Sequence, residues 1–389
     1  MPEYPRADRM QDIQPFRVME LLSRARQLEA EGRDIVHMEI GEPDFPSPEP
    51  VIRAVKNAIA EGDVHYTPAT GMLALREAIA GFYLQRYGVL VEPDRIVVTP
   101  GASGALLLVL GSLLNPGQTV LMADPGYPCN RNFVRFLEGR SRSISVTAET
   151  GYQLTAAQVE ANWDASTAAV LLASPSNPTG TVVPPKELQA ISQIVEQRGG
   201  RLLVDEIYHG LIYDSQAETI LALNDQAFVI NSFSKYFGLT GWRIGWVVAP
   251  AAAIPDLDKL AQNLFLAAPT PAQHAALAAF QPETLAILEQ RREAFQQRRD
   301  YLLPALRELG FDIPVTPQGA FYLYANCERF TDNSLDFAEA LLENAGVAVT
   351  PGLDFGHNQP EKHLRFAYTT SMERLQEGVR RLHQFISQT

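Results

Sequence analysis

A chain of 389 residues exceeds what one hydrophobic core usually fills, so we expect two domains. Its hydrophobic content of 46% and charged content of 20% are typical of a soluble globular protein. The net charge of −13 argues against nucleic acid and anionic membrane surfaces as partners, because both attract basic patches.

The cysteines and the N-terminal segment bear on the compartment. Cys129 and Cys327 have neither a metal-binding spacing nor the number needed for a disulfide framework. Residues 1–12 are polar and include two prolines, unlike a secretory signal, and no stretch approaches 18 apolar residues. We therefore expect a cytoplasmic protein with reduced thiols. The histidines lack the spacing of metal ligands, so no metal is expected.

The first expected element is a helix over residues 13–30. Short apolar runs that end at polar, glycine or proline residues then predict strands. These runs lie at 96–98, 120–122, 169–173, 201–204 and 228–230. Helical patterns separate them, which predicts an α/β fold with a mostly parallel sheet covered on both faces. Ligands bind beyond the carboxyl ends of such strands.

The pattern changes after residue 281. A long helix is expected over 283–309, which Pro304 could interrupt, and strands at 321–325, 347–349 and 364–368. An apolar stripe between Met372 and Ile386 predicts a packed terminal helix. We therefore expect a large domain at 41–281, a smaller α/β domain at 282–389, and an N-terminal arm at 1–40 that packs with the small domain.

The run from Ser232 to Gly245 is the most informative segment. Lys235 follows an apolar stretch, hydroxyl side chains stand at 232 and 234, and Arg243 comes eight residues after the lysine. An amine that forms a Schiff base must be held rigidly and partly desolvated, which this setting allows. A surface lysine in a turn is the alternative.

Three further clusters sit at expected strand ends or on strands. The small residues 101–104 suit either a phosphate at a helix N-terminus or a helix capped by Ser103. Asp205 ends a buried strand, where a carboxylate needs a partner, an N-cap role or a salt bridge. Arg365 lies among apolar strand residues, so it needs an anion, either a substrate carboxylate or a structural acid.

The Lys235 run and the order of these clusters resemble the class I/II pyridoxal-phosphate-dependent aminotransferases, which are aspartate aminotransferase-like enzymes of fold type I. The resemblance covers nearly the whole chain and implies a seven-stranded sheet. It also implies a Schiff base between Lys235 and pyridoxal 5′-phosphate. The residues that it assigns to the phosphate are Ala102, Ser103, Ser232, Arg243 and, from the other subunit of a homodimer, Tyr66.

The same resemblance assigns residues to the cofactor ring and to the substrate. Asp205 would hold the ring nitrogen protonated, Tyr208 and Asn177 would bind the 3′-oxygen, and Tyr127 would stack on the ring. A core tyrosine is the alternative for Tyr127. The list of substrate-binding residues that it implies is Gly41, Asn177 and Arg365. Lys235, Asp205 and Tyr208 would be the catalytic residues.

The implied reaction moves an amino group between an α-amino acid and a 2-oxo acid. Apolar residues of the arm (Ile13, Phe16, Val18 and Met19) favour neutral aliphatic or aromatic amino acids, with glutamate and 2-oxoglutarate as the second pair. A C–S β-lyase or a decarboxylase on the same scaffold stays open. A ligand-sensing regulatory module is a remote alternative, because such proteins need a basic DNA-binding extension.

Overall fold

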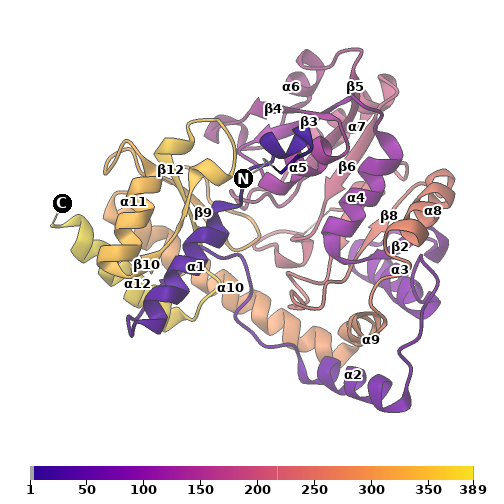
Figure 1. Ribbon diagram of the computed structural model, residues 1–389, viewed down its shortest axis with the longest axis horizontal. Helices are drawn as coiled ribbons and strands as arrows, with labels where there is room; N and C mark the ends of the chain where they lie inside the picture. The colour runs from indigo at the N-terminus through magenta and orange to yellow at the C-terminus, as the bar shows by residue number, and fades with distance from the viewer. Residues whose placement is uncertain (1–3, 217, 389) are drawn as a thin grey trace.

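The computed structural model describes residues 4–216 and 218–388, so residues 1–3 of the expected N-terminal arm lie outside it. A seven-stranded sheet with helices on both faces occupies one part of the molecule, and a smaller group of strands and helices lies beside it (Figure 1). The strand order is β2-β8-β7-β6-β5-β3-β4. Only β8 runs antiparallel to its neighbours, so the predicted mostly parallel seven-stranded sheet is confirmed. The strands are β2 (Ile96–Thr99), β3 (Thr119–Asp124), β4 (Arg140–Ser145), β5 (Thr167–Ala173), β6 (Arg201–Asp205), β7 (Phe228–Ser232) and β8 (Gly245–Val248).

The central strands are apolar on both faces because helices cover both faces. In β6, Leu202 and Val204 face one core while Leu203 between them faces another, as the alternation of strand side chains requires. The second core also contains Leu106 and Val109 of α4. The helices that precede or follow these strands are α2 (Glu49–Glu61), α3 (Leu73–Tyr87), α4 (Gly101–Leu113), α5 (Pro128–Phe136), α6 (Ala156–Ala161), α7 (Pro185–Gln197), α8 (Ile254–Leu264) and α9 (Thr270–Ala279).

The smaller group contains the antiparallel sheet β11-β12-β9 and the parallel pair β1-β10. Its members are α1 (Arg17–Ala30), β1 (Val36–His37), α10 (Pro282–Leu309), β9 (Tyr322–Asn326), α11 (Ser334–Ala340), β10 (Val347–Ala348), β11 (Thr350–Pro351), β12 (His363–Ala367) and α12 (Met372–Ile386). The expected strands and terminal helix are therefore present. Two expectations need correction. Pro304 lies inside α10 without ending it, and the N-terminal helix begins at Arg17 rather than at Ile13.

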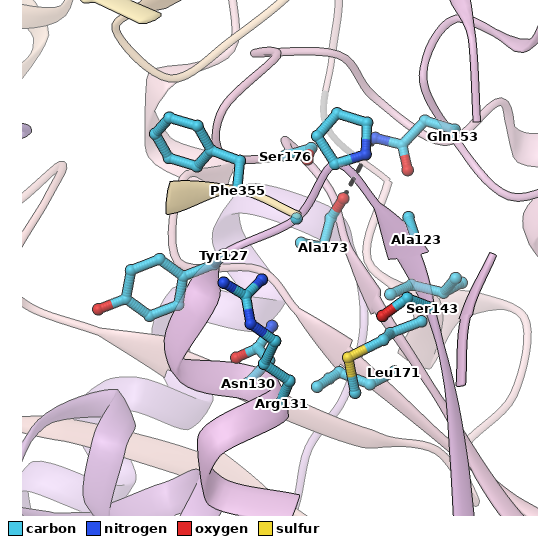
Figure 2. A pocket seen from close by; sticks show the side chains of 14 residues that line it. Ala123, Tyr127, Asn130, Arg131, Ser143, Gln153, Leu171, Ala173, Ser176 and Phe355 are labelled. Atoms are coloured by element: carbon cyan, nitrogen blue, oxygen red, sulfur yellow. Dashed lines mark hydrogen bonds between the residues drawn. The ribbon is translucent and has the colours of Figure 1, made fainter. Parts of the chain in front are cut away.

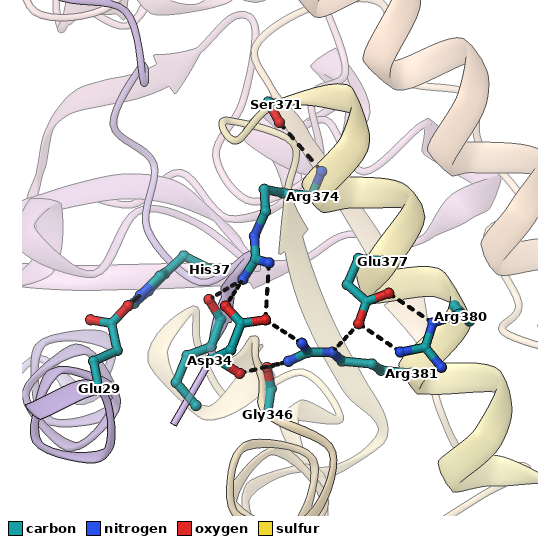
Figure 3. Close-up of polar contacts among 10 residues, drawn as sticks. Glu29, Asp34, His37, Gly346, Ser371, Arg374, Glu377, Arg380 and Arg381 are labelled. Atoms are coloured by element: carbon teal, nitrogen blue, oxygen red, sulfur yellow. Dashed lines mark hydrogen bonds and ion pairs between the residues drawn. The ribbon is translucent and has the colours of Figure 1, made fainter. Parts of the chain in front are cut away.

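Ion pairs join the segment before β1 to the C-terminal helix (Figure 3). Asp34 accepts hydrogen bonds from Arg374 and Arg381 of α12, and Arg381 also bonds Glu377 of the same helix. The N-terminal segment is thus held by the last helix of the chain, and β1, which follows it, pairs with β10 of the smaller group. Within residues 4–216 and 218–388, no helix is both long enough and apolar enough to cross a bilayer.

Candidate functional site

A cavity of about 350 Å³ lies where the central sheet meets the smaller group of elements. Its floor includes the carboxyl ends of β5, β6 and β7, as expected for an α/β sheet. All the residues that the sequence singled out line it, except Tyr66: Gly41, Ala102, Ser103, Tyr127, Asn177, Asp205, Tyr208, Ser232, Lys235, Arg243 and Arg365.

Lys235 follows the last strand residue of β7 by three positions and points into the cavity. Its Nζ donates a hydrogen bond of 2.7 Å to the carbonyl oxygen of Gly41. Burial lowers the pKa of Lys235 to about 8, and the positive charge of Arg365 acts in the same direction. The amine can therefore reach its neutral, nucleophilic form near neutral pH.

Asp205 is the last residue of β6 and is only 7% exposed. Its Oδ1 accepts a hydrogen bond of 3.1 Å from the backbone N–H of Ile207, and no described arginine or lysine forms a salt bridge with it. Neither structural alternative considered from the sequence, an N-cap or a salt bridge to arginine, is found. Burial raises the pKa of Asp205 to about 6. An unpaired carboxylate that faces a cavity fits a cationic N–H of a ligand.

Tyr208 and Asn177 bring two further polar groups to the cavity. Tyr208 lies in a turn after β6 and before a short 3-10 helix (His209–Leu211). Its hydroxyl lies 2.9 Å from the hydroxyl of Tyr322. Asn177 Oδ1 accepts from Arg365 Nη1 at 3.0 Å. The Asn177 amide N–H₂ is consequently left as a donor.

Arg365 on β12 is 2% exposed and has no acidic partner among the described residues. It donates to Asn177, to the backbone carbonyl of Glu39 and to the hydroxyl of Thr350 at 3.2 Å. Its buried Nε has no hydrogen-bond partner. Since a guanidinium pairs with carboxylates through two parallel bonds, an incompletely satisfied arginine beside a cavity suits a carboxylate ligand.

The N-terminus of α4 forms the other end of the cavity. The helix begins at Gly101 after Pro100, and no side chain caps it, so the alternative of a Ser103 cap is wrong. Gly101 has φ of +71°, and a Cβ there would lie 2.6 Å from Arg243 Nη2. The glycine therefore lets Arg243 approach the first backbone N–H groups of the helix. Free N–H groups beside a guanidinium form an anion site.

Tyr127 stands at the start of α5 on the opposite wall. Its ring meets Phe16 edge-on, with centroids 6.3 Å apart. A second, small cavity of about 30 Å³ lies behind it, beside Arg131 and Phe355 (Figure 2). That space is enough for a water molecule but not for a larger ligand. Tyr127 also lines the main cavity, where the resemblance would place it against the cofactor ring.

Tyr66 is the exception among the predicted residues. It is 86% exposed and does not line the cavity of its own chain. Its loop is fixed, since Thr270 Oγ1 donates to the carbonyl of His65 and Gln273 donates to Thr67. The side chain is therefore presented to the outside on a supported loop.

Several cavity residues carried no signal in the sequence. Phe16, Val18 and Met19 at the start of α1 were expected from the arm and line the cavity, whereas Ile13, also expected, does not. Tyr322 was not singled out. Asp354 does not line the cavity and was not singled out either, although its carboxylate accepts from the backbone N–H groups of Arg17 and Val18 at 3.0 and 2.9 Å. Both residues act on partners far away in the chain, which local patterns do not reveal.

Comparisons with known proteins agree with this geometry. A sequence model of the family described as aminotransferase class I and II matches residues 33–382. The valine–pyruvate aminotransferase of Mycobacterium tuberculosis is 38% identical over 372 residues, 95% of this chain and 96% of the relative. A crystal structure of an aminotransferase from Mycobacterium tuberculosis superposes with a TM-score of 0.96 at 37% identity, covering 100% of both chains. Aspartate aminotransferase from Thermus thermophilus with maleate gives a TM-score of 0.93 at 32% identity, over 98% of this chain and 100% of that one.

Proposed function

The chain belongs to the class I and II aminotransferases, and from this premise we propose that it moves an amino group between a neutral, apolar α-amino acid and a 2-oxo acid. The cofactor of this family, and of this chain, is pyridoxal 5′-phosphate. One observation carries the proposal. A lysine with a lowered pKa, an unpaired buried carboxylate and a buried arginine nitrogen without a partner converge on one cavity.

The residues present fit the cofactor group by group. Ala102, Ser103 and Arg243, with Ser232 beneath them, would take the phosphate at the start of α4. The unpaired Asp205 would pair with the ring nitrogen, and the donors of Tyr208 and Asn177 would take the 3′-oxygen. Tyr127 would contact the ring face. When bound, the cofactor supplies an electron sink for the electrons of the substrate Cα–H bond.

Lys235 has two duties in this proposal. It would hold the cofactor covalently until the amine of the substrate takes its place. Burial lowers the pKa of the Lys235 amine to about 8, so a substantial fraction of it is neutral near that pH once it is released. The neutral amine can accept a proton from the substrate Cα and return it to a neighbouring carbon. Its bond to the Gly41 carbonyl fixes the Nζ between these duties.

Arg365 would bind the α-carboxylate of the substrate, assisted by the amide of Asn177 and the backbone of Gly41. Three cations among the described residues line the cavity. In this proposal Lys235 attaches the cofactor, Arg243 binds its phosphate and Arg365 binds the α-carboxylate of the substrate. No further arginine or lysine of the described chain lines the cavity, where the start of α1 contributes Phe16, Val18 and Met19. An apolar substrate side chain suits these residues, and the similar valine–pyruvate enzyme supports that choice. Glutamate and 2-oxoglutarate form the proposed second pair.

We further propose a homodimer. Tyr66 is exposed, and its loop is bonded to the segment that carries the exposed Leu264 and Leu266. An apolar surface of this kind suits a second copy of the chain, whose phosphate site Tyr66 would complete. The division into an arm at 1–40, a large domain at 41–281 and a small domain at 282–389 is part of the same proposal. The cytoplasmic location stays a prediction.

Single-turnover absorbance tests the reaction. The protein loaded with pyridoxal 5′-phosphate is mixed with one amino acid at a time, without a 2-oxo acid. Conversion of the cofactor spectrum to that of pyridoxamine phosphate, with one equivalent of 2-oxo acid released, is the expected result. Release of ammonia with pyruvate, or of carbon dioxide, would instead support the β-lyase or decarboxylase alternative.

The substrate class needs a matched set. Valine, leucine, phenylalanine, alanine and aspartate are compared as donors with 2-oxoglutarate as acceptor, and all of them except alanine also with pyruvate. The apolar wall predicts higher kcat/KM for valine, leucine or phenylalanine than for aspartate. A preference for aspartate would contradict the proposed substrate class while leaving the aminotransferase reaction intact.

A further inference from the structure

Tyr322 brings a second phenol to the polar wall of the cavity. It begins β9, pairs with Ala367 of β12 and is 1% exposed. Its hydroxyl lies 2.9 Å from that of Tyr208, and the Cζ of Arg365 lies 4.3 Å from the centre of its ring. Tyr322 therefore touches both a proposed cofactor ligand and the proposed carboxylate anchor.

Space for the Tyr322 hydroxyl is provided by Gly41. A Cβ at Gly41 would overlap the Tyr322 hydroxyl and approach the ring carbon that carries it. The absence of a side chain there is thus required by close approach, because Gly41 is not among the residues with positive φ. The hydroxyl of Tyr322 lies between Gly41 and Tyr208, while Arg365 lies over its ring, so three separate segments surround this side chain.

Each phenol hydroxyl has one proton to donate, so the hydrogen bond between Tyr208 and Tyr322 has one of two directions. Burial raises the pKa of both Tyr208 and Tyr322, so both are neutral and one donates to the other. Tyr322 is the only described residue whose side chain hydrogen-bonds the Tyr208 hydroxyl. If Tyr208 donates to Tyr322, its proton is used within the protein. If Tyr322 donates to Tyr208, the Tyr208 proton is free for a ligand.

We propose that Tyr322 is a positioning residue that donates its proton to Tyr208, directs the Tyr208 hydroxyl to the 3′-oxygen of the cofactor, and supports the plane of Arg365 with its ring. The inference rests on the proposed function. Because hydrogen bonds in a chain strengthen one another, a phenol that accepts from Tyr322 is also a better donor to the next oxygen.

The test uses the holoenzyme and a double-mutant cycle of Tyr322→Phe and Tyr208→Phe. The readouts are the pH titration of the bound cofactor's visible absorbance and the dissociation constant of the cofactor from fluorescence titration of the apoprotein. Tyr208→Phe is expected to raise the pKa of that titration. Tyr322→Phe should also raise the pKa of the cofactor titration, by about 0.5 to 1 pKa unit, which corresponds to the free energy of one hydrogen bond. In the Tyr208→Phe background, Tyr322→Phe should add nothing.

Tyr324→Phe is the matched control. Tyr324 stands two residues further along β9 and is also buried, but it does not line the cavity, so its substitution should leave the titration unchanged. Gly41→Ala is a second route, because it displaces the Tyr322 hydroxyl without removing it, and it should also raise the titration pKa. If the melting temperature shows that Tyr322→Phe does not fold, the Gly41→Ala variant tests the role of the Tyr322 hydroxyl instead.

The outcomes separate this inference from the proposed function. An unchanged titration in Tyr322→Phe beside a shifted one in Tyr208→Phe overturns the role of Tyr322 alone. Additive shifts in the double variant overturn it too, because Tyr322 would then act without Tyr208. A wild-type protein that forms no coloured complex with pyridoxal 5′-phosphate at Lys235 contradicts the proposed function itself.

Discussion

The two walls of the cavity are built in different ways. The wall on the central sheet consists of residues at or just beyond the ends of parallel strands, such as Asp205 at the end of β6 and Lys235 three positions after β7. The facing wall is assembled from the start of α1, from β9 and from β12, and its residues are held across long stretches of sequence. Val18 bonds Asp354, 336 positions away. In the proposed function the sheet wall carries the reaction chemistry. The facing wall would bind the substrate, with its shared α-carboxylate at Arg365 of β12 and its variable side chain at the start of α1.

This difference predicts how substitutions behave. A side chain at a strand end is held by a buried ladder of backbone hydrogen bonds, so replacing it changes chemistry more than position. A side chain on the facing wall depends on contacts between separate segments, so replacing it changes position and selectivity. The predictions below test that contrast, from the largest expected effect to the smallest.

Lys235→Ala is expected to abolish turnover, with a loss above about 10⁴-fold, because it removes both the covalent attachment and the general base. The protein should still fold, and dialysis measures whether it retains the cofactor non-covalently. Borohydride reduction of the wild-type holoenzyme followed by peptide mapping checks the assignment. The exposed Lys259, replaced by alanine, is the control. A label on Lys56, Lys186 or Lys259 would contradict the assignment.

Asp205→Ala should lower kcat by about 10²–10⁴-fold with a modest loss of cofactor, since the ring nitrogen loses its charged partner. Rapid-mixing absorbance measures the proton-transfer step. Rates close to wild type would make Asp205 a structural residue only.

The same carboxyl predicts a pH effect on the protein without cofactor. Burial raises the pKa of Asp205 to about 6 from 3.8, so the folded state binds more protons than the unfolded chain between these values. The free energy of unfolding therefore falls as the pH rises through that window, by at most about 3 kcal/mol. Asp205→Asn without cofactor should be more stable than wild type at pH 8 and similar to it near pH 4. Denaturant melts at the two pH values measure this. No difference at pH 8 would mean that the carboxylate is not destabilising in the folded protein.

Complementation tests the contribution from a second chain. Lys235→Ala and Tyr66→Phe are mixed under conditions of subunit exchange. If Tyr66 acts in the neighbouring site, one site of a mixed dimer carries both lesions and the other carries neither. Activity should return toward one site per mixed dimer, provided that Tyr66→Phe alone impairs cofactor retention. An active monomer by light scattering, or no recovery after proven exchange, would show that Tyr66 does not act across subunits.

The sequence predicted the sheet wall far better than the facing wall, for a physical reason. Asp205 directly follows one short apolar run and Lys235 comes a few residues after another. Parallel strands bring their carboxyl ends to one edge, so local patterns predict where these side chains meet. Tyr322 contacts Tyr208 over 114 positions, and nothing near it in the sequence distinguishes it from a core tyrosine. At Pro304 the local pattern misled: it suggested a break in the helix, but the long, packed helix α10 continues through the proline.

Substitution of Asp354 is expected to have the smallest effect, and it tests most directly whether the facing wall sets substrate selectivity. Its two carboxylate oxygens accept from the first backbone N–H groups of α1, which carries Val18 and Met19 into the cavity. In Asp354→Asn one acceptor becomes a donor, so the start of α1 should loosen by about 1 kcal/mol, the usual value of a helix cap. We expect kcat/KM for valine or phenylalanine to fall about 3- to 10-fold, while that for alanine, which does not reach this wall, changes little.

The control for this prediction is Asp336→Asn, an exposed aspartate in the first turn of α11. It should leave both values of kcat/KM unchanged. Phe355 is the residue after Asp354, and the centre of its ring lies 4.9 Å from the guanidinium carbon of Arg365. An equal loss for alanine and phenylalanine would therefore mean that Asp354 acts through the carboxylate anchor, which every substrate shares. A loss confined to large side chains would mean that the N-terminal segment selects the substrate and that Asp354 holds it in place.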